Sequence, residues 1–225
     1  MDMNRSAGRL VAVLVLAQAA AGGFVDFGLL MPIFSAPGGY LANAAAHATT
    51  VSLAVLLGIA MGAISLAIAI AIWPLLRQRS EAMALWLLAL AVAGFALAAV
   101  ENTTTLSLLS LSQAYAKTAA ADAALFDALR GVVAAARNWA HYVNLIVAGA
   151  TILVFYGALF RFTLVPRLLA AFGLAAALSQ MTAVAAPLFG HPVVFPMIAP
   201  LGLCQLALAA WLLARGFAEG RRSAG

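Results

Sequence analysis

The sequence predicts an all-α fold: one integral membrane domain, residues 1–225, built from six transmembrane helices. The chain is 66% hydrophobic and 8% charged, with a mean hydropathy of +1.07, whereas soluble domains carry about 25% charged residues. Its apolar runs reach the roughly 20 residues that a spanning helix needs, and they are far longer than the roughly ten-residue strands of membrane barrels. The predicted spans are residues 10–31, 51–74, 83–111, 138–160, 166–187 and 193–217.

The basic residues predict that both termini lie in the cytoplasm. When six spans alternate, nine of the twelve Lys and Arg residues fall on the side of the N-terminus, as the positive-inside rule requires. These nine are Arg5, Arg9, Arg77, Arg79, Arg161, Arg167, Arg215, Arg221 and Arg222, and the other three are Lys117, Arg130 and Arg137. They occur singly or in pairs at helix ends, so the net charge of +5 does not predict a nucleic-acid partner. The excess of Arg over Lys and the abundance of Ala are typical of bacteria with G+C-rich DNA, and we expect the bacterial cytoplasmic (inner) membrane.

The first span admits two interpretations. Arg5, Arg9, the apolar run from Leu10 and the small residues Ala19–Ala21 also fit a cleavable signal peptide, whose removal would leave five spans. The apolar run continues to Met31 and is long enough to cross a bilayer, which favours a retained helix.

Turn residues predict the connections between the first three spans. The segment Pro32–Thr50 contains Pro and Gly and no basic residue, so we expect an irregular outer loop in which Thr49 or Thr50 caps span two. A short inner turn at Arg77–Ser80 makes spans two and three a hairpin, and the Ser-Glu pair at its end is a typical helix start.

The segment 119–136 predicts an interfacial helix on the outer surface before span four. Its apolar side chains share one helical face, opposite its acidic and basic ones. The apolar face contains Leu125, Phe126, Leu129, Val132 and Val133, and the polar face Asp122, Asp127 and Arg130. The alternative is one continuous helix that protrudes from the membrane.

Prolines punctuate the last two spans. Pro166 suits the first turn of span five, and Pro187, Pro192 and Pro196 bracket a tight outer turn. Pro200 lies inside span six, where we expect a kink. The chain shows no fixed-period repeat, so the sequence does not suggest the inverted halves of many transporters.

Two carboxylates inside the predicted spans are the main candidates for a functional site. Asp26 lies near the outer end of span one, just after Gly22 and Gly23, and Glu101 interrupts the apolar run of span three. An ionisable group costs roughly 2.5–3.5 kcal/mol in a span, so it needs a partner, water or a function.

Polar side chains from other spans join these carboxylates. Asn138, His141 and Asn144 recur every three residues and share a face of span four, while Asn102 follows Glu101 directly. Gln180 and Gln205 place amides nearer the middle of the membrane, where they should face the bundle interior. Because most of these groups belong to the outer half, the sequence predicts an outward-opening polar pocket that binds a ligand or protons. A structural hydrogen-bond network and simple interfacial exposure are the alternatives.

Metal and cofactor sites are not expected. The histidines His47, His141 and His191 lie on the predicted outer side with suitable chemistry for zinc, but their spacing matches no local ligand motif. All three lie at or outside span ends, which argues against haem. The one lysine, Lys117, is external, which excludes a retinal-type pigment, and Cys204 is expected to be a small core residue.

Small residues on span two predict close helix packing. Gly58 and Gly62 lie one turn apart and would let another helix approach, either within the chain or in a homo-oligomer. We expect membrane lipid as the surrounding partner.

The chain resembles a family of bacterial six-to-seven-helix membrane proteins of unknown function over most of its length. The resemblance rests on four segments of the sequence: Asn4–Leu10, His141–Tyr142, Leu164–Leu169 and Leu206–Leu213. Members of that family tend to carry an acidic residue in the last helix, where this chain has Gln205. The resemblance therefore implies the architecture and no particular activity.

Three classes of function fit these observations. The first is an inner-membrane protein that binds a small apolar or amphiphilic molecule, with proton-linked transport through Asp26, Glu101 and His141. The second is an intramembrane isomerase or cyclase that uses these groups as acid and base on a lipid-like substrate. The third is a partner-binding or sensory subunit without chemistry.

Overall fold

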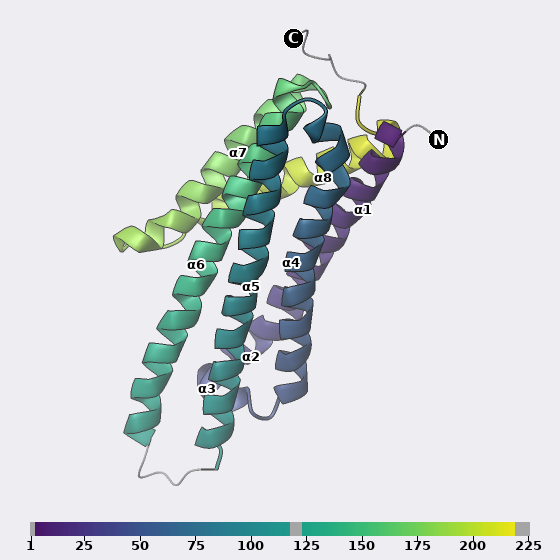
Figure 1. Ribbon diagram of the computed structural model, residues 1–225. Helices are drawn as coiled ribbons and strands as arrows, with labels where there is room; N and C mark the ends of the chain where they lie inside the picture. The colour runs from purple at the N-terminus through teal and green to yellow at the C-terminus, as the bar shows by residue number, and fades with distance from the viewer. Residues whose placement is uncertain (1–2, 118–122, 219–225) are drawn as a thin grey trace. The chain divides into compact units, whose positions relative to one another are not determined.

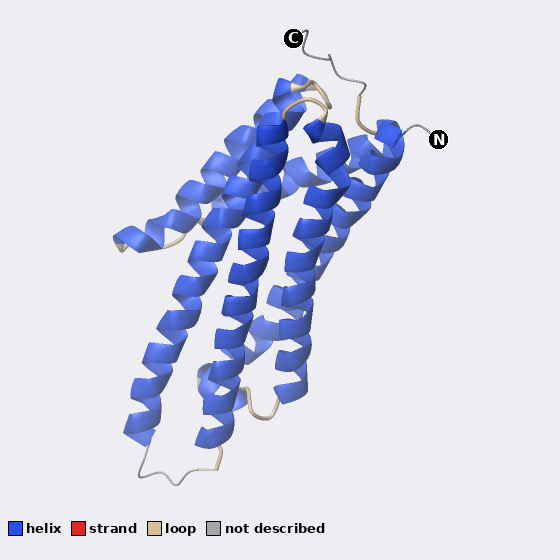
Figure 2. Ribbon diagram, viewed as in Figure 1, coloured by secondary structure: helices blue, strands red, loops and turns tan. Residues whose placement is uncertain are grey.

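The computed structural model describes residues 3–117 and 123–218. In this part of the chain the regular structure is helical and no strand occurs (Figure 2). Its six helical stretches that are long and apolar enough to cross a membrane are Asn4–Ser35, Ala48–Arg77, Glu81–Tyr115, Ala124–Arg161, Arg167–Phe189 and Phe195–Arg215. The predicted all-α, multi-pass membrane protein is confirmed. The cytoplasmic position of the termini stays a prediction, and two residues that support it, Arg221 and Arg222, lie outside the described residues.

The helices form two compact units. The elements in chain order are α1 (Met3–Gly23), η1 (Phe24–Leu30), α2 (Met31–Ser35), α3 (Gly39–Asn43), α4 (Ala48–Arg77), α5 (Glu81–Tyr115), α6 (Ala123–Arg161), α7 (Arg167–Ala185), η3 (Ala186–Phe189), η4 (Phe195–Met197) and α8 (Ala199–Arg215) (Figure 1). Unit 1 contains the described residues of Met1–Ala19, Ala63–Phe95 and Leu145–Gly225, and unit 2 contains Ala20–Gly62 and the described residues of Ala96–Asn144. Helices α4, α5 and α6 therefore contribute a part to each unit.

Unit 1 holds the larger apolar core. Fully buried side chains from the ends of its helices meet there, among them Ile72 and Leu76 of α4, Tyr156 of α6 and Leu208 of α8. The α4–α5 turn has the predicted hairpin form, since α4 ends at Arg77 and the Ser80 hydroxyl accepts a hydrogen bond from the Met83 amide at 3.3 Å.

The proline prediction for span six is wrong. Helix α8 begins at Ala199, so Pro200 lies in its first turn, where a missing N–H costs no intrahelical hydrogen bond. The three residues of η4 precede it, and Pro200 therefore begins the helix instead of kinking it.

The outer loop after span one is more regular than predicted. Helices α2 and α3 occupy much of Pro32–Thr50, and α4 begins at Ala48, so the two threonines lie inside its first turn and do not cap it. Between α2 and α3 the backbone of Gly38 has φ +83°, and a β-carbon there would lie 2.8 Å from the Ala42 β-carbon. A glycine is required at this turn.

A buried serine fastens this outer segment to α5. The Ser112 hydroxyl, which is fully buried, donates to the Leu41 carbonyl at 2.7 Å and accepts from the Ala45 amide at 2.9 Å. One side chain thus satisfies two backbone groups that the short helix α3 leaves without partners.

We expect Ser112→Ala to lower the free energy of unfolding by about 1–3 kcal/mol, because it leaves the half-buried Ala45 N–H and the buried Leu41 carbonyl unpaired. Ser110→Ala is the matched control, since the Ser110 hydroxyl is exposed and bonds only to the Leu106 carbonyl of its own helix. Unfolding in mixed micelles measures both variants, and equal stabilities would contradict the fastening role of Ser112.

The predicted interfacial helix does not exist as a separate element. Helix α6 runs without a break from Ala123 to Arg161, which is the continuous-helix alternative. Asp122 and residues 119–121 of the predicted segment lie outside the described residues. The sequence of the first part of α6 does have an amphipathic pattern. No proline or glycine turn lies between this pattern and span four, so the helix continues.

Candidate functional site

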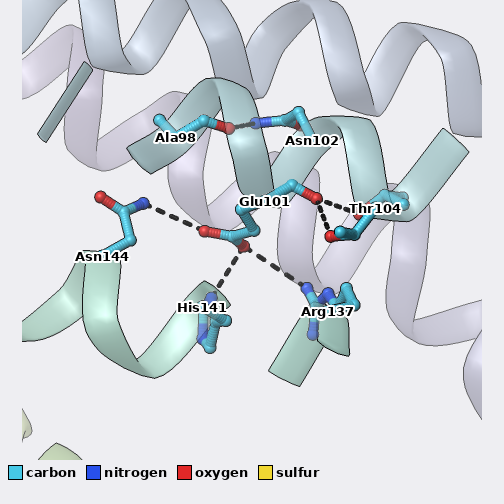
Figure 3. Close-up of polar contacts among 8 residues, drawn as sticks. Ala98, Glu101, Asn102, Thr104, Arg137, His141 and Asn144 are labelled. Atoms are coloured by element: carbon cyan, nitrogen blue, oxygen red, sulfur yellow. Dashed lines mark hydrogen bonds and ion pairs between the residues drawn. The ribbon is translucent and has the colours of Figure 1, made fainter. Parts of the chain in front are cut away.

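The carboxylate of Glu101 is the centre of a polar cluster in unit 2. Glu101 lies on α5, and its side chain is 15% exposed. One carboxylate oxygen, Oε1, lies 2.8 Å from His141 Nδ1 and 3.7 Å from Arg137 Nη2. The other, Oε2, accepts a hydrogen bond from Asn144 Nδ2 at 3.0 Å. Figure 3 shows the three side chains of α6 directed at this one carboxylate.

The helical period of α6 explains why these three residues act together. Arg137, His141 and Asn144 are spaced at i, i+4 and i+7, which places them on one face of the helix. Sequence reasoning found His141 and Asn144 but missed Arg137, because the predicted break before span four placed that residue on the outer side. Asn138, the first member of the predicted stripe, is exposed and does not join the cluster.

Arg137 is held from two sides. Its side chain is 17% exposed, and its guanidinium carbon lies 5.8 Å from the centre of the Phe34 ring on α2, a cation–π distance. The Phe34 ring also packs on Tyr40 of α3, with ring centres 4.8 Å apart. Burial raises the pKa of Tyr40 to about 12 despite the opposing charge of Arg137, so Tyr40 stays protonated and donates to the Thr105 carbonyl at 3.4 Å.

The residues after Glu101 do not enlarge the cluster. The hydroxyls of Thr104 and Thr105 donate to the Glu101 backbone carbonyl at 2.7 and 3.1 Å (Figure 3). Asn102 donates to the Ala98 carbonyl and packs against Gly58, where a β-carbon would lie 2.5 Å from the Asn102 side-chain oxygen. Gly58 is therefore used for packing within the chain, and association of two copies through Gly58 and Gly62 stays a prediction.

Asp26 lies near the cluster without bonding to it. It belongs to η1, a π-helical segment in which the Met31 amide donates to the Asp26 carbonyl. Its side chain is exposed and has no hydrogen bond or ion pair within the described residues. The charges of His141, Arg137 and Glu101 nevertheless act on it. Single π-helical turns occur often at functional sites, because they reorient one side chain within a helix.

The two glutamines of the predicted pocket belong to unit 1. Gln180 on α7 is 6% exposed, and its Oε1 is buried without a hydrogen-bond partner in the described structure. Gln205 on α8 is half-buried. An open groove of about 490 Å³ also lies in unit 1, lined by Trp73, Pro74, Arg77 and Gln78. The pocket predicted around Asp26 and Glu101 stays a prediction.

The described residues form no metal centre. Within the described ranges, no three His, Cys, Asp or Glu side chains are placed to hold a metal ion. His47 is exposed in the loop before α4, and Cys204 is a fully buried core residue of α8.

The cluster has defined proton chemistry. If Glu101 is ionised, it can only accept hydrogen bonds, so neutral His141 must carry its proton on Nδ1. That leaves Nε2 free to accept a second proton, and the His141 side chain is 31% exposed. Arg137 stays charged in either state. The site therefore contains one group, His141, that can gain and lose a proton while its orientation is fixed by hydrogen bonding.

The comparison with known proteins identifies a family. The model of the family described as a domain of unknown function (DUF4386) matches residues 10–216, which is more than half of the chain. No curated protein and no solved structure matches this sequence. The chain therefore belongs to the DUF4386 family, in agreement with the resemblance to a membrane family of unknown function.

Proposed function

We propose that this family member is a bacterial inner-membrane protein that binds a small apolar or amphiphilic molecule and couples this binding, as a basis for proton-linked transport, to a change in the protonation of the site. The observation that supports the proposal is the half-buried Glu101 carboxylate with its three donors from α6. This cluster contains a histidine, a side chain that can bind a second proton, and a carboxylate that fixes its tautomer.

The linkage follows from charge. Adding a proton to Nε2 of His141 changes the cluster by one full charge in a medium of low dielectric, where such a change is costly unless a bound molecule responds to it. A molecule that contacts the cluster must therefore bind with different affinity to the two protonation states.

The proposal predicts a defined result for His141→Gln. Glutamine can still donate to Glu101 but does not titrate. We expect small molecules retained by the gently purified wild type to be released severalfold more at one end of the range of about pH 5 to 8 than at the other, and this pH dependence to disappear in His141→Gln. Untargeted mass spectrometry of the released molecules is the measurement.

Asn138→Gln is the matched control, because Asn138 is exposed on the same helix and outside the cluster. It should behave like the wild type. If wild type, control and His141→Gln release the same molecules with the same pH dependence, the cluster is structural and a partner-binding role becomes the better proposal.

An intramembrane acid–base enzyme is the second candidate. A carboxylate that orients a histidine is also the arrangement of a general base, and the His141–Glu101 distance of 2.8 Å suits it. Product formed from an added lipid-like substrate, and lost in His141→Gln, would favour an isomerase or cyclase over a binding protein.

A further inference from the structure

We propose that the molecule bound at this site is an amphiphilic amine, a cation with an apolar body, and that its ammonium group takes the place of a proton beside Asp26. The inference rests on the proposed function and names its substrate class.

The first step is the charge balance of unit 2. In the described spans of this unit, Asp127 and Arg130 pair with each other at 3.4 Å on the exposed face of α6. Besides the phenols of Tyr115 and Tyr142, the remaining ionisable groups are Asp26, Glu101, Arg137 and His141. The charged groups of these spans are therefore two carboxylates and one permanent cation. With His141 neutral the cluster carries one uncompensated negative charge, which is costly in a membrane.

The second step is that only one of the two carboxylates is available to pair with a ligand. Both oxygens of Glu101 are occupied, by His141 and Asn144, and Arg137 lies opposite Oε1. Asp26 is exposed and makes no hydrogen bond or ion pair with the described residues. A cation that enters the site would therefore pair with Asp26, while Glu101 keeps its partners.

The third step concerns the rest of the ligand. Asp26 lies within the span Asn4–Ser35, so a molecule that reaches it must have a substantial apolar part. Two aromatic side chains of the same π-helical segment, Phe24 and Phe27, are 54% and 68% exposed. Exposed aromatic rings on this helix offer apolar contact to a hydrocarbon body. A small inorganic cation would not use this contact.

The exchange is balanced in charge. The site with the Asp26 carboxyl protonated binds R–NH₃⁺ and releases that carboxyl proton to water, so the net charge of the site is unchanged and no covalent bond to the ligand forms or breaks. The titratable and charged groups that act on Asp26 are Glu101 on α5 and Arg137 and His141 on α6. Arg137 keeps its proton and Glu101 is ionised, so these groups set the charge around Asp26 and the Asp26 carboxyl supplies the proton. Binding must therefore become tighter as the pH rises, because fewer protons compete for the site.

Three fluorescent dansyl probes with one alkyl chain and an ammonium, hydroxyl or carboxylate end test the inference. Binding is measured by fluorescence anisotropy with the protein in nanodiscs of zwitterionic lipid, with partitioning into empty nanodiscs subtracted. We expect the ammonium probe to bind about ten- to a hundredfold more tightly than the hydroxyl probe, as a charge-assisted contact requires. Asp26→Asn should remove this difference, and Asp26→Glu should keep most of it.

The control variant is Asp127→Asn, which removes an exposed carboxylate of the same unit and should leave all three affinities unchanged. A pH indicator in weak buffer should record about one proton released for each ammonium probe bound to the wild type, a result that does not depend on any variant.

Two outcomes separate this inference from the proposed function. If the hydroxyl probe binds as tightly as the ammonium probe, and its binding still requires His141, the amine assignment is wrong and the proposed function stands. If no probe binds the wild type above empty nanodiscs, both are wrong.

Discussion

Glu101→Gln should lower the free energy of unfolding by about 3–5 kcal/mol, which is the usual cost of removing one partner from a buried ion pair. The substitution keeps the size of the side chain and removes its charge. Arg137 is 17% exposed and cannot release its proton, so it would remain as an uncompensated cation between α5 and α6. Equilibrium unfolding in mixed micelles measures the loss.

The control for Glu101→Gln is the exposed ion pair of the same helix. Asp127 and Arg130 are 66% and 52% exposed, and Asp127→Asn should change the free energy of unfolding by less than about 0.5 kcal/mol. The double variant Glu101→Gln/Arg137→Gln should recover more than half of the loss, because it removes the stranded cation as well. A loss below about 1 kcal/mol in the single variant would show that water already solvates the cluster.

The cluster illustrates what helical periodicity can and cannot predict. The spacing of His141 and Asn144 places both on one face of α6, and the cost of an ionisable residue in a span drew attention to Glu101. Arg137 follows the same period, one turn earlier. It was missed because an amphipathic pattern was interpreted as a separate helix, although the chain contains no breaker between that pattern and span four.

The segment around Asp26 shows a different limit. Gly22 and Gly23 predict local flexibility, yet in a span every backbone N–H and carbonyl needs a partner within the chain. The chain meets this requirement by continuing as the π-helical segment η1 instead of unwinding. No property of the sequence distinguishes a π-helical turn from an α-helical one at this point, so the open position of Asp26 could be found only in the structure.

The prolines lie near the helix boundaries of the last two spans, but the predicted effect of Pro200, a kink within span six, is wrong. The apolar run begins at Val193, which suggested that Pro200 lay well inside span six. Pro192 and Pro196 shorten that run from its start, and the regular helix begins only at Ala199. Hydropathy sets which residues enter the membrane, while the missing N–H of proline sets where the helix begins.

Gly173→Ala should lower the free energy of unfolding by about 1–3 kcal/mol, the usual cost of inserting a group into a filled core. A β-carbon at this position of α7 would overlap the ring of Tyr156 on α6, which is 1% exposed and belongs to the apolar core of unit 1. The ring has no open space to enter, so either the Tyr156 side chain leaves its rotamer or the two helices separate locally.

Gly94→Ala on α5 is the control with the opposite expected sign. Its added methyl group would lie 4.0 Å from Val147 Cγ1, which is an ordinary van der Waals distance. Replacing an interior helical glycine by alanine should then raise the free energy of unfolding by up to about 1 kcal/mol. Tyr156→Leu removes the ring. In that background Gly173→Ala should lower the free energy of unfolding by less than it does in the wild type. If Gly173→Ala is as stable as Gly94→Ala, the close approach of α6 and α7 at Tyr156 is wrong.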